Sequence, residues 1–333
     1  MIFAEISTNL PEEHFKRLKG EIGKGDSILQ RINDVENNFP NSSIMHKKFF
    51  RKICDESFLK KLIISTPDIL EYLKNNELKE FNDLFYDNAT NPPKTKPFSE
   101  YVLGIFGYKN FRDNKNGNWF SKALNIKACP YCNSQYTLTT NSNILCEYDH
   151  FFPKDKYPYL CVSFYNLIPI CSSCNRKKSD KEFSTKENYH PYFNDLHKIF
   201  SFSINFKRAI DFLIGGRNNI ENIKIDLVLN KIYFGKAEEI IFENHKDNFP
   251  IEELYENHKD VVAELLLKSQ IYNKKYKEQL LSLKISNNKI KGNLFSEEEL
   301  NQLIVGNYIK EEDFLKRPLS KLTYDISKEL RLI

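Results

Sequence analysis

Four of the seven cysteines form two CxxC pairs, Cys129 with Cys132 in CPYC and Cys171 with Cys174 in CSSC. Two intervening residues allow both thiolates of a pair to turn toward one ion, and two such pairs complete a tetrahedral four-cysteine zinc site. Free thiols and a duplicated redox pair are the alternatives, but the spacing favours structural Zn²⁺. Because the segment 133–170 is longer than in a usual zinc ribbon, the ion is expected to hold together the ends of an inserted unit.

That inserted segment contains a second candidate centre in EYDHFFPK, residues 147–154. Hydrolysis of a phosphodiester needs an activated water and charge compensation at the phosphate. His150 can accept the proton of that water, because imidazole titrates near neutral pH. Asp149 and the side-chain carbonyl of Asn175 are hard oxygen ligands, which suit Mg²⁺ or Mn²⁺ rather than zinc.

Three cations, Arg176, Lys177 and Lys178, follow the second CxxC pair. They are expected to lie at the start of a helix, where free N–H groups and positive side chains favour phosphate. Taken singly, each candidate residue has an ordinary structural interpretation. Asp149 can cap a helix, His150 can lie in a core, and the cations can form a solvated face. Because these residues occur together beside a predicted zinc site, a catalytic role is favoured over these structural roles.

The segments YDHFFPK, YNLIPIC and CSSCNRKK together resemble the HNH endonuclease superfamily. The family pattern is DH-x-x-P, then N-L-x-x-x-C, then C-x-x-C-N/H-x-x-K, and here the third position is Asn175 where many members have His. The resemblance implies a ββα-metal fold in which Asn166 orients His150 or ties the intervening loop. It implies Asp149, His150, Asn166 and Asn175 as the catalytic set.

The longer string DHFFPKDKYPYLCVSFYNLIPICSSCN is most similar to the PtuB family of HNH nucleases, found in Septu and retron-associated antiphage systems. This resemblance implies a partner ATPase of the ABC/SMC type, PtuA-like, and a role in antiviral defence. DNA is the expected substrate. Because a metal site reads a phosphate and not a sugar, RNA such as tRNA stays an alternative. The second alternative is a non-catalytic, zinc-containing adaptor that binds nucleic acid.

Several residues near these motifs have no assigned role. His190, in NYHPYF, can return to the metal or phosphate, but packing among its aromatic neighbours is favoured. Glu147 can face solvent or assist the metal. The remaining thiols, Cys54, Cys146 and Cys161, have no partner spacing and are expected to be buried as small apolar residues.

The elements around this centre divide the chain into a helical region 1–120, a nuclease module 121–195 and a C-terminal region 196–333. Residues 9–85 show helical periodicity, with a helix start at Thr66, Pro67 and Asp68. The polar, proline-containing segment 87–98 is predicted to be a connection. Residues 198–207 and 220–234 alternate like strands, with GGRNN from Gly215 as a loop, and a helical pattern returns from about residue 251. The fold class is therefore α+β, mostly helical, with a zinc-stapled ββα module in the middle.

Composition excludes several classes of protein. The 333 residues are 41% hydrophobic and 14% aromatic, which is typical of a folded chain. No apolar run is long enough for a membrane helix, and the N-terminus lacks a signal-peptide pattern, so we expect a cytoplasmic protein without membrane partners. The net charge of +4 does not itself indicate nucleic acid.

Residues 268–291 are either a phosphate-binding surface or a solvated helix face. Their lysines are Lys268, Lys274, Lys275, Lys277, Lys284, Lys289 and Lys291.

Overall fold

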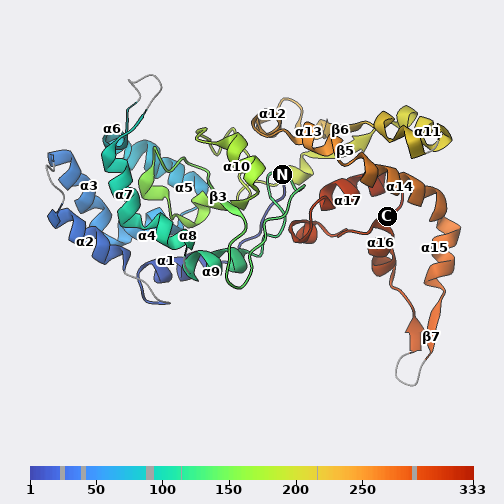
Figure 1. The fold of residues 1–333 in the computed structure, drawn as a ribbon, viewed down its shortest axis with the longest axis horizontal. Coiled ribbons are helices and arrows are strands. Elements are labelled where there is room, and N and C mark those ends of the chain that lie inside the picture. The colour runs from blue at the N-terminus through green and yellow to red at the C-terminus, as the bar shows by residue number, and fades with distance from the viewer. Residues whose placement is uncertain (23–26, 39–42, 88–93, 114, 216, 287–290) are drawn as a thin grey trace. The chain divides into compact units, whose positions relative to one another are not determined.

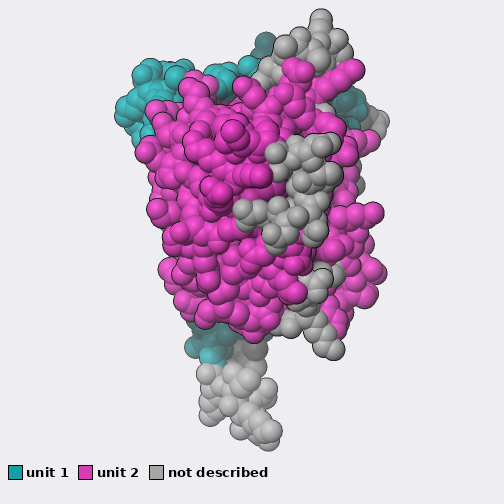
Figure 2. Space-filling model, turned by 90° about the vertical axis from the view of Figure 1, so that its left-hand side faces the viewer, with its two compact units in different colours: residues 1–2, 127–136, 195–333 teal, residues 3–126, 137–194 magenta. Residues whose placement is uncertain are grey.

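The computed structural model describes residues 1–22, 27–38, 43–87, 94–113, 115–215, 217–286 and 291–333. These residues form two compact units, each assembled from segments that are distant in sequence (Figure 2). We call residues 3–126 and 137–194 the N-terminal unit, and residues 1–2, 127–136 and 195–333 the C-terminal unit. The division at residues 120 and 195 stays a prediction.

Helices make up most of the N-terminal unit, as the periodicity of residues 9–85 predicts. The predicted helix start at Pro67 is confirmed, although the side chain of Thr66 makes no capping hydrogen bond. The helices of this unit are α1 Leu10–Leu18, α2 Ile28–Asn38, α3 Ile44–Cys54, α4 Glu56–Ile64, α5 Pro67–Tyr72, α6 Asn82–Phe85, α7 Pro97–Phe106, α8 Tyr108–Asp113, α9 Lys115–Leu124 and α10 Ser172–Lys178 (Figure 1).

A cluster of aromatic rings forms the core beneath these helices. The ring centroid of Phe49 lies 5.5 Å from that of Phe81, 5.2 Å from Phe85 and 5.9 Å from Phe98. Tyr159, from the segment that precedes the second CxxC pair, joins the cluster at 6.2 Å from Phe49. Edge-to-face packing at these distances adds to the hydrophobic stabilisation. The N-terminal helices and residues 137–194 therefore share one core.

Two antiparallel strand pairs complete this unit. Strand β1 (Tyr86–Asp87) pairs with β2 (Lys94–Thr95) inside the predicted connection, of which residues 88–93 lie outside the described residues. Strand β3 (Glu147–His150) pairs with β4 (Leu167–Ile170), so that His150 lies opposite Leu167. Helix α10 follows β4 directly and contacts β3, which gives the order strand, strand, helix.

Gly117 allows helices α8 and α9 to approach each other closely. A Cβ atom at this position would lie 2.6 Å from the backbone oxygen of Phe111, which is closer than packing permits. The hydroxyl of Tyr148 donates a hydrogen bond to the Gly117 oxygen at 2.7 Å. The helix pair is thereby fixed to strand β3.

The C-terminal unit combines a small sheet with helices. Strands β5 (Phe200–Ile204) and β6 (Ile225–Leu229) confirm the strands predicted within 198–207 and 220–234. Helix α11 lies between β5 and β6 in the sequence and was not predicted. Gly216, which belongs to the predicted GGRNN loop, lies outside the described residues. The other elements of this unit are α11 Phe206–Gly215, α12 Ala237–Asn248, α13 Ile251–Glu256, α14 Lys259–Ile271, α15 Lys274–Leu281, β7 Lys284–Ser286, β8 Lys291–Asn293, α16 Glu297–Val305 and α17 Ser320–Glu329.

A buried ion pair attaches α17 to strand β5. The ammonium group of Lys321 lies 2.8 Å from Asp325 and donates to the Phe200 oxygen at 2.9 Å. Asp325 also accepts the backbone N–H of Phe202 at 2.9 Å. Both side chains are buried, so each charge depends on the other for compensation.

The described residues are mostly helical, with four two-stranded sheets, in agreement with an α+β class. Within the described part of the chain, every helix is too short or too polar to cross a bilayer.

Candidate functional site

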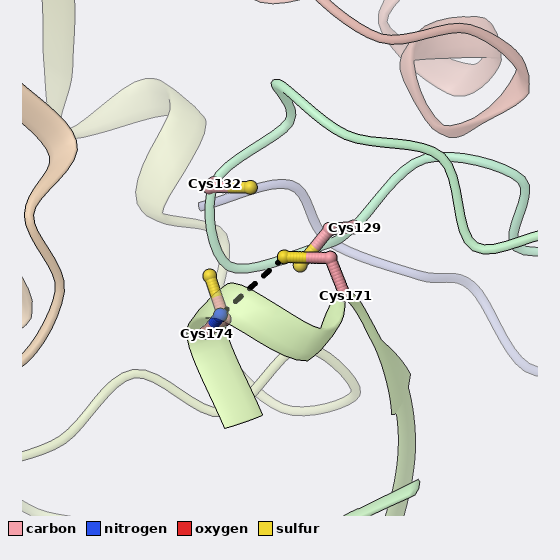
Figure 3. A group of neighbouring side chains, drawn as sticks. All are labelled: Cys129, Cys132, Cys171 and Cys174. Atoms are coloured by element: carbon pink, nitrogen blue, oxygen red, sulfur yellow. Dashed lines mark hydrogen bonds between the residues drawn. The ribbon is translucent and has the colours of Figure 1, made fainter. Parts of the chain in front are cut away.

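Cys129, Cys132, Cys171 and Cys174 come together in one buried cluster, as their spacing predicts (Figure 3). Their sulfur atoms all lie within 4.8 Å of one another. Cys171 is the N-cap of helix α10, and its sulfur accepts the backbone N–H of Cys174 at 3.5 Å. The sulfur of Cys132 accepts hydrogen bonds from the N–H and the hydroxyl of Ser134, both at 3.4 Å. Hydrogen bonds of this kind hold ligand side chains in position around a metal.

The cluster fits a tetrahedral zinc ion. Zn–S bonds of about 2.3 Å place the four sulfurs roughly 3.8 Å apart, so the observed cluster needs at most a small contraction. The other three cysteines do not join it. Cys146 and Cys161 are buried, as expected, whereas Cys54 is half-buried.

His150 lies at the end of strand β3 with its ring held from two sides. Its Nε2 donates to the backbone oxygen of Cys161 at 3.0 Å. The ring of Tyr108 packs edge-on against it, with centroids 4.6 Å apart. Because Nε2 carries the proton, Nδ1 is the basic nitrogen of this tautomer. Burial, together with the charges of Lys154 and Lys178, lowers the pKa of His150 to about 3, so the ring is neutral at physiological pH. The expectation that this imidazole titrates near neutral pH is therefore wrong, and His150 is a weaker base than a free imidazole.

Asp149 is buried beside a buried lysine. The ammonium group of Lys178 lies 3.0 Å from Asp149 Oδ1 and donates to the backbone oxygen of His150 at 2.7 Å. Lys178 is fully buried, and Asp149 is 2% exposed. A carboxylate offers about four lone-pair sites on its two oxygens, so the ion pair is compatible with a metal on the same carboxylate. Contact of Lys178 with phosphate stays a prediction, because in this structure its charge is directed at Asp149.

Asn166 ties the loop between the two strands. Its side-chain oxygen accepts the N–H of Phe152 at 2.7 Å, and its amide nitrogen donates to the oxygens of Phe152 at 3.1 Å and Leu160 at 2.9 Å. These are the bonds expected of the loop-tying role. The ring of His150 is oriented by Cys161 instead.

The three remaining candidates lie on helix α10. Asn175 is half-buried, and Arg176 and Lys177 are exposed. The helix is seven residues long, with Cys171 as its N-cap, and Arg176, Lys177 and Lys178 form its last turn. The prediction that these cations lie at the start of the helix, beside its free N–H groups, is therefore wrong. Ligation of a metal or phosphate by the three candidates stays a prediction.

His190 has a structural environment. Its Nε2 donates to the Tyr165 oxygen at 2.9 Å, and its Nδ1 accepts the N–H of Tyr192 at 3.2 Å. The ring also packs on Phe151 at 4.5 Å. Because both nitrogens are used, the favoured packing role is confirmed. Glu147, the other undecided residue, forms an ion pair with Arg112 at 2.9 Å.

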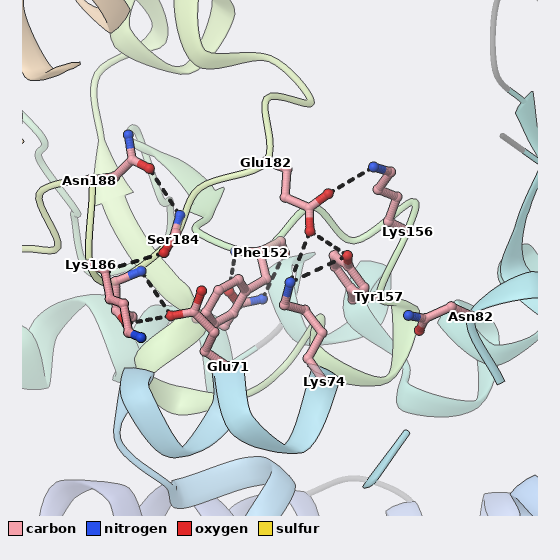
Figure 4. Close-up of polar contacts among 12 residues, drawn as sticks. Glu71, Lys74, Asn82, Phe152, Lys156, Tyr157, Glu182, Ser184, Lys186 and Asn188 are labelled. Atoms are coloured by element: carbon pink, nitrogen blue, oxygen red, sulfur yellow. Dashed lines mark hydrogen bonds and ion pairs between the residues drawn. The ribbon is translucent and has the colours of Figure 1, made fainter. Parts of the chain in front are cut away.

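Sequence reasoning missed a polar cluster behind the loop between β3 and β4 (Figure 4). Glu182 accepts hydrogen bonds from Lys74 at 2.9 Å, from Lys156 at 2.8 Å and from the hydroxyl of Tyr157. Although burial acts to raise it, these bonds lower the pKa of Glu182 to about 2. Lys74 is 4% exposed and lies 5.3 Å from the centre of the Phe152 ring. The N-terminal helices thus support the loop that carries Phe152, although no motif in residues 1–120 indicates it.

Comparison with curated proteins found one partial similarity to report. The chain is 35% identical over 86 residues to Septu protein PtuB of Bacillus thuringiensis. The match covers 24% of this chain and 32% of PtuB, so the chain spans about a third of that relative's length. No family model and no solved structure matched the chain. The similarity supports a relationship to Septu proteins.

Proposed function

We propose that this protein is a metal-dependent HNH endonuclease that hydrolyses phosphodiester bonds in nucleic acid. The observation that carries the proposal is the state of His150 at the end of a β3–β4–α10 unit. Its Nε2–H is bonded to the Cys161 oxygen, which leaves Nδ1 as the basic atom. Asp149, the proposed oxygen ligand, precedes His150 at the end of β3; because consecutive strand residues face opposite sides, the two would flank a phosphate placed at this strand end.

In the proposed reaction, His150 accepts the proton of the attacking water at Nδ1. Asp149 and Asn175 would hold Mg²⁺ or Mn²⁺, which would supply positive charge to compensate the phosphate. Asn166 keeps the loop between the strands in place through three backbone contacts. Arg176 and Lys177, both exposed on α10, contact neighbouring phosphates.

We further propose that the four-cysteine cluster holds structural zinc. The burial of all four thiols and their mutual distances within 4.8 Å support this assignment. The ion would fix Cys171 and Cys174 at the start of α10, the helix that also carries Asn175. Zinc would therefore stabilise the site without entering the reaction.

The partial similarity to PtuB supports a role in antiphage defence with an ABC-type, PtuA-like ATPase as partner. In this proposal the ATPase restrains the nuclease or positions it on its substrate. Co-expression with an ATPase encoded beside the gene should yield a stable complex and alter cleavage. Cleavage unaffected by every neighbouring ATPase would contradict the partnership but not the nuclease.

The nuclease proposal is tested with purified protein on plasmid DNA and on total tRNA, with and without added Mg²⁺ or Mn²⁺, and with and without the ATPase. We expect DNA strands to be cut only when the metal is added. Cleavage confined to tRNA would keep the fold and change the substrate to RNA. Absence of cleavage under every combination of substrate, metal and ATPase would refute the nuclease proposal and favour a non-catalytic adaptor.

A further inference from the structure

A hollow in the N-terminal unit lies outside the residues assigned so far. It has a volume of about 1150 Å³ and is formed by the end of α8, by α9 and by the turn at residues 141–144. That turn is held in place by side chains of α9. Asn118 donates to the Thr140 oxygen at 3.0 Å, and Lys122 donates to Asn141 Oδ1 at 3.1 Å. The hollow is therefore a preformed feature of the fold.

The chemistry of the hollow suits an anion with a planar apolar part. Its cations are Arg112, Lys115 and Lys122, and Asp113 is the one acid among its described lining residues. Trp119, the chain's single tryptophan, also lines it. Cationic grooves with an aromatic side chain bind nucleic acid by phosphate contacts and base stacking.

Helix α8 connects this hollow to the candidate active site. Tyr108 and Arg112 are four residues apart and so lie on one face of the helix. Tyr108 packs on His150, and Arg112 pairs with Glu147 on the same strand. Four residues span about 6 Å along a helix. A strand of a duplex advances about 3.4 Å per nucleotide, so this spacing along α8 corresponds to roughly two nucleotide steps.

We propose that this hollow binds the substrate strand about two nucleotides from the phosphate that is cut. Lys115 and Lys122 contact the phosphates, and Trp119 stacks on a base or a sugar edge. The guanidinium group of Arg17 lies 4.2 Å from the centre of the Trp119 ring, and the His14 ring lies nearly parallel to it at 6.4 Å, so the indole is held in position. This proposal rests on the nuclease function proposed above and names where its substrate is held.

The test measures binding without cleavage. Full-length protein without added Mg²⁺ or Mn²⁺ is titrated with a fluorescein-labelled DNA duplex, a single DNA strand and a single RNA strand. Anisotropy reports total binding, and the fluorescence of Trp119 reports occupation of the hollow. The test variant is Lys115→Gln with Lys122→Gln. The matched control is Lys47→Gln with Lys79→Gln, which removes two exposed lysines of the N-terminal unit that do not line the hollow.

We expect saturable quenching of Trp119 that follows the anisotropy. Losing two phosphate contacts should weaken duplex binding about 60-fold at 0.1 M salt and reduce the slope of log K against log salt by about 1.8. The Lys47/Lys79 variant should bind like wild type. Binding with no change in Trp119, or equal affinity of the Lys115/Lys122 variant, would overturn the proposal even if the protein cleaves DNA. Quenching and charge-dependent binding without any cleavage would support substrate binding in the hollow and refute the proposed nuclease function instead.

Discussion

At the residue scale, Lys178 connects the two groups on which the proposed chemistry depends. It is fully buried, pairs with Asp149 at 3.0 Å and bonds the His150 oxygen at 2.7 Å. A buried charge is stable only when it is compensated, so neither member of the pair can be removed without cost. Lys178 thus holds the end of strand β3 from helix α10.

This environment predicts a loss of stability in Lys178→Met. Removing the lysine leaves the Asp149 charge buried without its cation, which costs roughly 3–5 kcal/mol. The matched control is Lys177→Met, one residue earlier and exposed, where the expected change is within about 0.5 kcal/mol. Urea unfolding measures both. Equal unfolding free energies for the two variants would show that the pair does not stabilise the fold.

The sequence predicted the cluster of four cysteines, but not how the polar atoms of His150 and His190 are used. The cysteine cluster followed from spacing, because two CxxC pairs have a recognised ligand geometry. The partners of His150 and His190 are the backbone oxygens of Cys161 and Tyr165. Every residue type has a backbone oxygen, so no sequence pattern marks such a contact.

At the element scale, helix α10 joins the two candidate metal centres. It begins after Cys171, contains Cys174 and Asn175, and ends at Lys178. Such a short helix is marginal by itself and needs contacts outside it. The cysteine cluster at its start and the ion pair at its end supply these contacts.

Metal analysis tests this view of α10. Wild-type protein should contain about one zinc per chain, and Cys174→Ser should lose both the zinc and much of its thermal stability. Cys54→Ser, which changes a half-buried thiol outside the cluster, should keep both. A Cys174→Ser protein with full zinc content and wild-type melting would refute the four-cysteine site.

Element boundaries in the C-terminal unit were harder to predict than those near the motifs. The alternation in residues 198–207 indicated β5 but ran past its end at Ile204. Helix α11 follows at once and exposes Ile210 and Ile214, so its apolar residues do not form one clean buried stripe. Tertiary contacts with neighbouring elements decide such segments, and single-sequence periodicity does not contain them.

At the scale of the whole molecule, burial of histidine makes stability depend on pH. Five of the seven histidines are buried: His14, His150, His190, His197 and His245. Burial lowers the pKa of His14 to about 4 from 6.5. Below about pH 6.5 the unfolded chain binds a proton that the folded protein excludes, so folding weakens as the pH falls toward 4.

The expected decrease from His14 alone is at most about 1.4 kcal/mol per pH unit between pH 6.5 and 4. Denaturant unfolding at several pH values measures it. His14→Phe removes this titration at a site surrounded by Phe111, Phe120 and Phe164, and should give a shallower pH dependence. An unchanged slope would show that His14 is protonated equally in both states.

The central claim is that His150 is the general base of a nuclease, and the rate of plasmid cleavage by His150→Ala tests it most directly. The assay uses Mg²⁺ or Mn²⁺, with protein shown to keep wild-type circular dichroism and zinc content, and His46→Ala as a histidine control on helix α3. A positioned general base contributes about 10²–10⁴-fold, so His150→Ala should cut at least about 100-fold more slowly while His46→Ala cuts normally. Cleavage by His150→Ala at the wild-type rate would contradict the account.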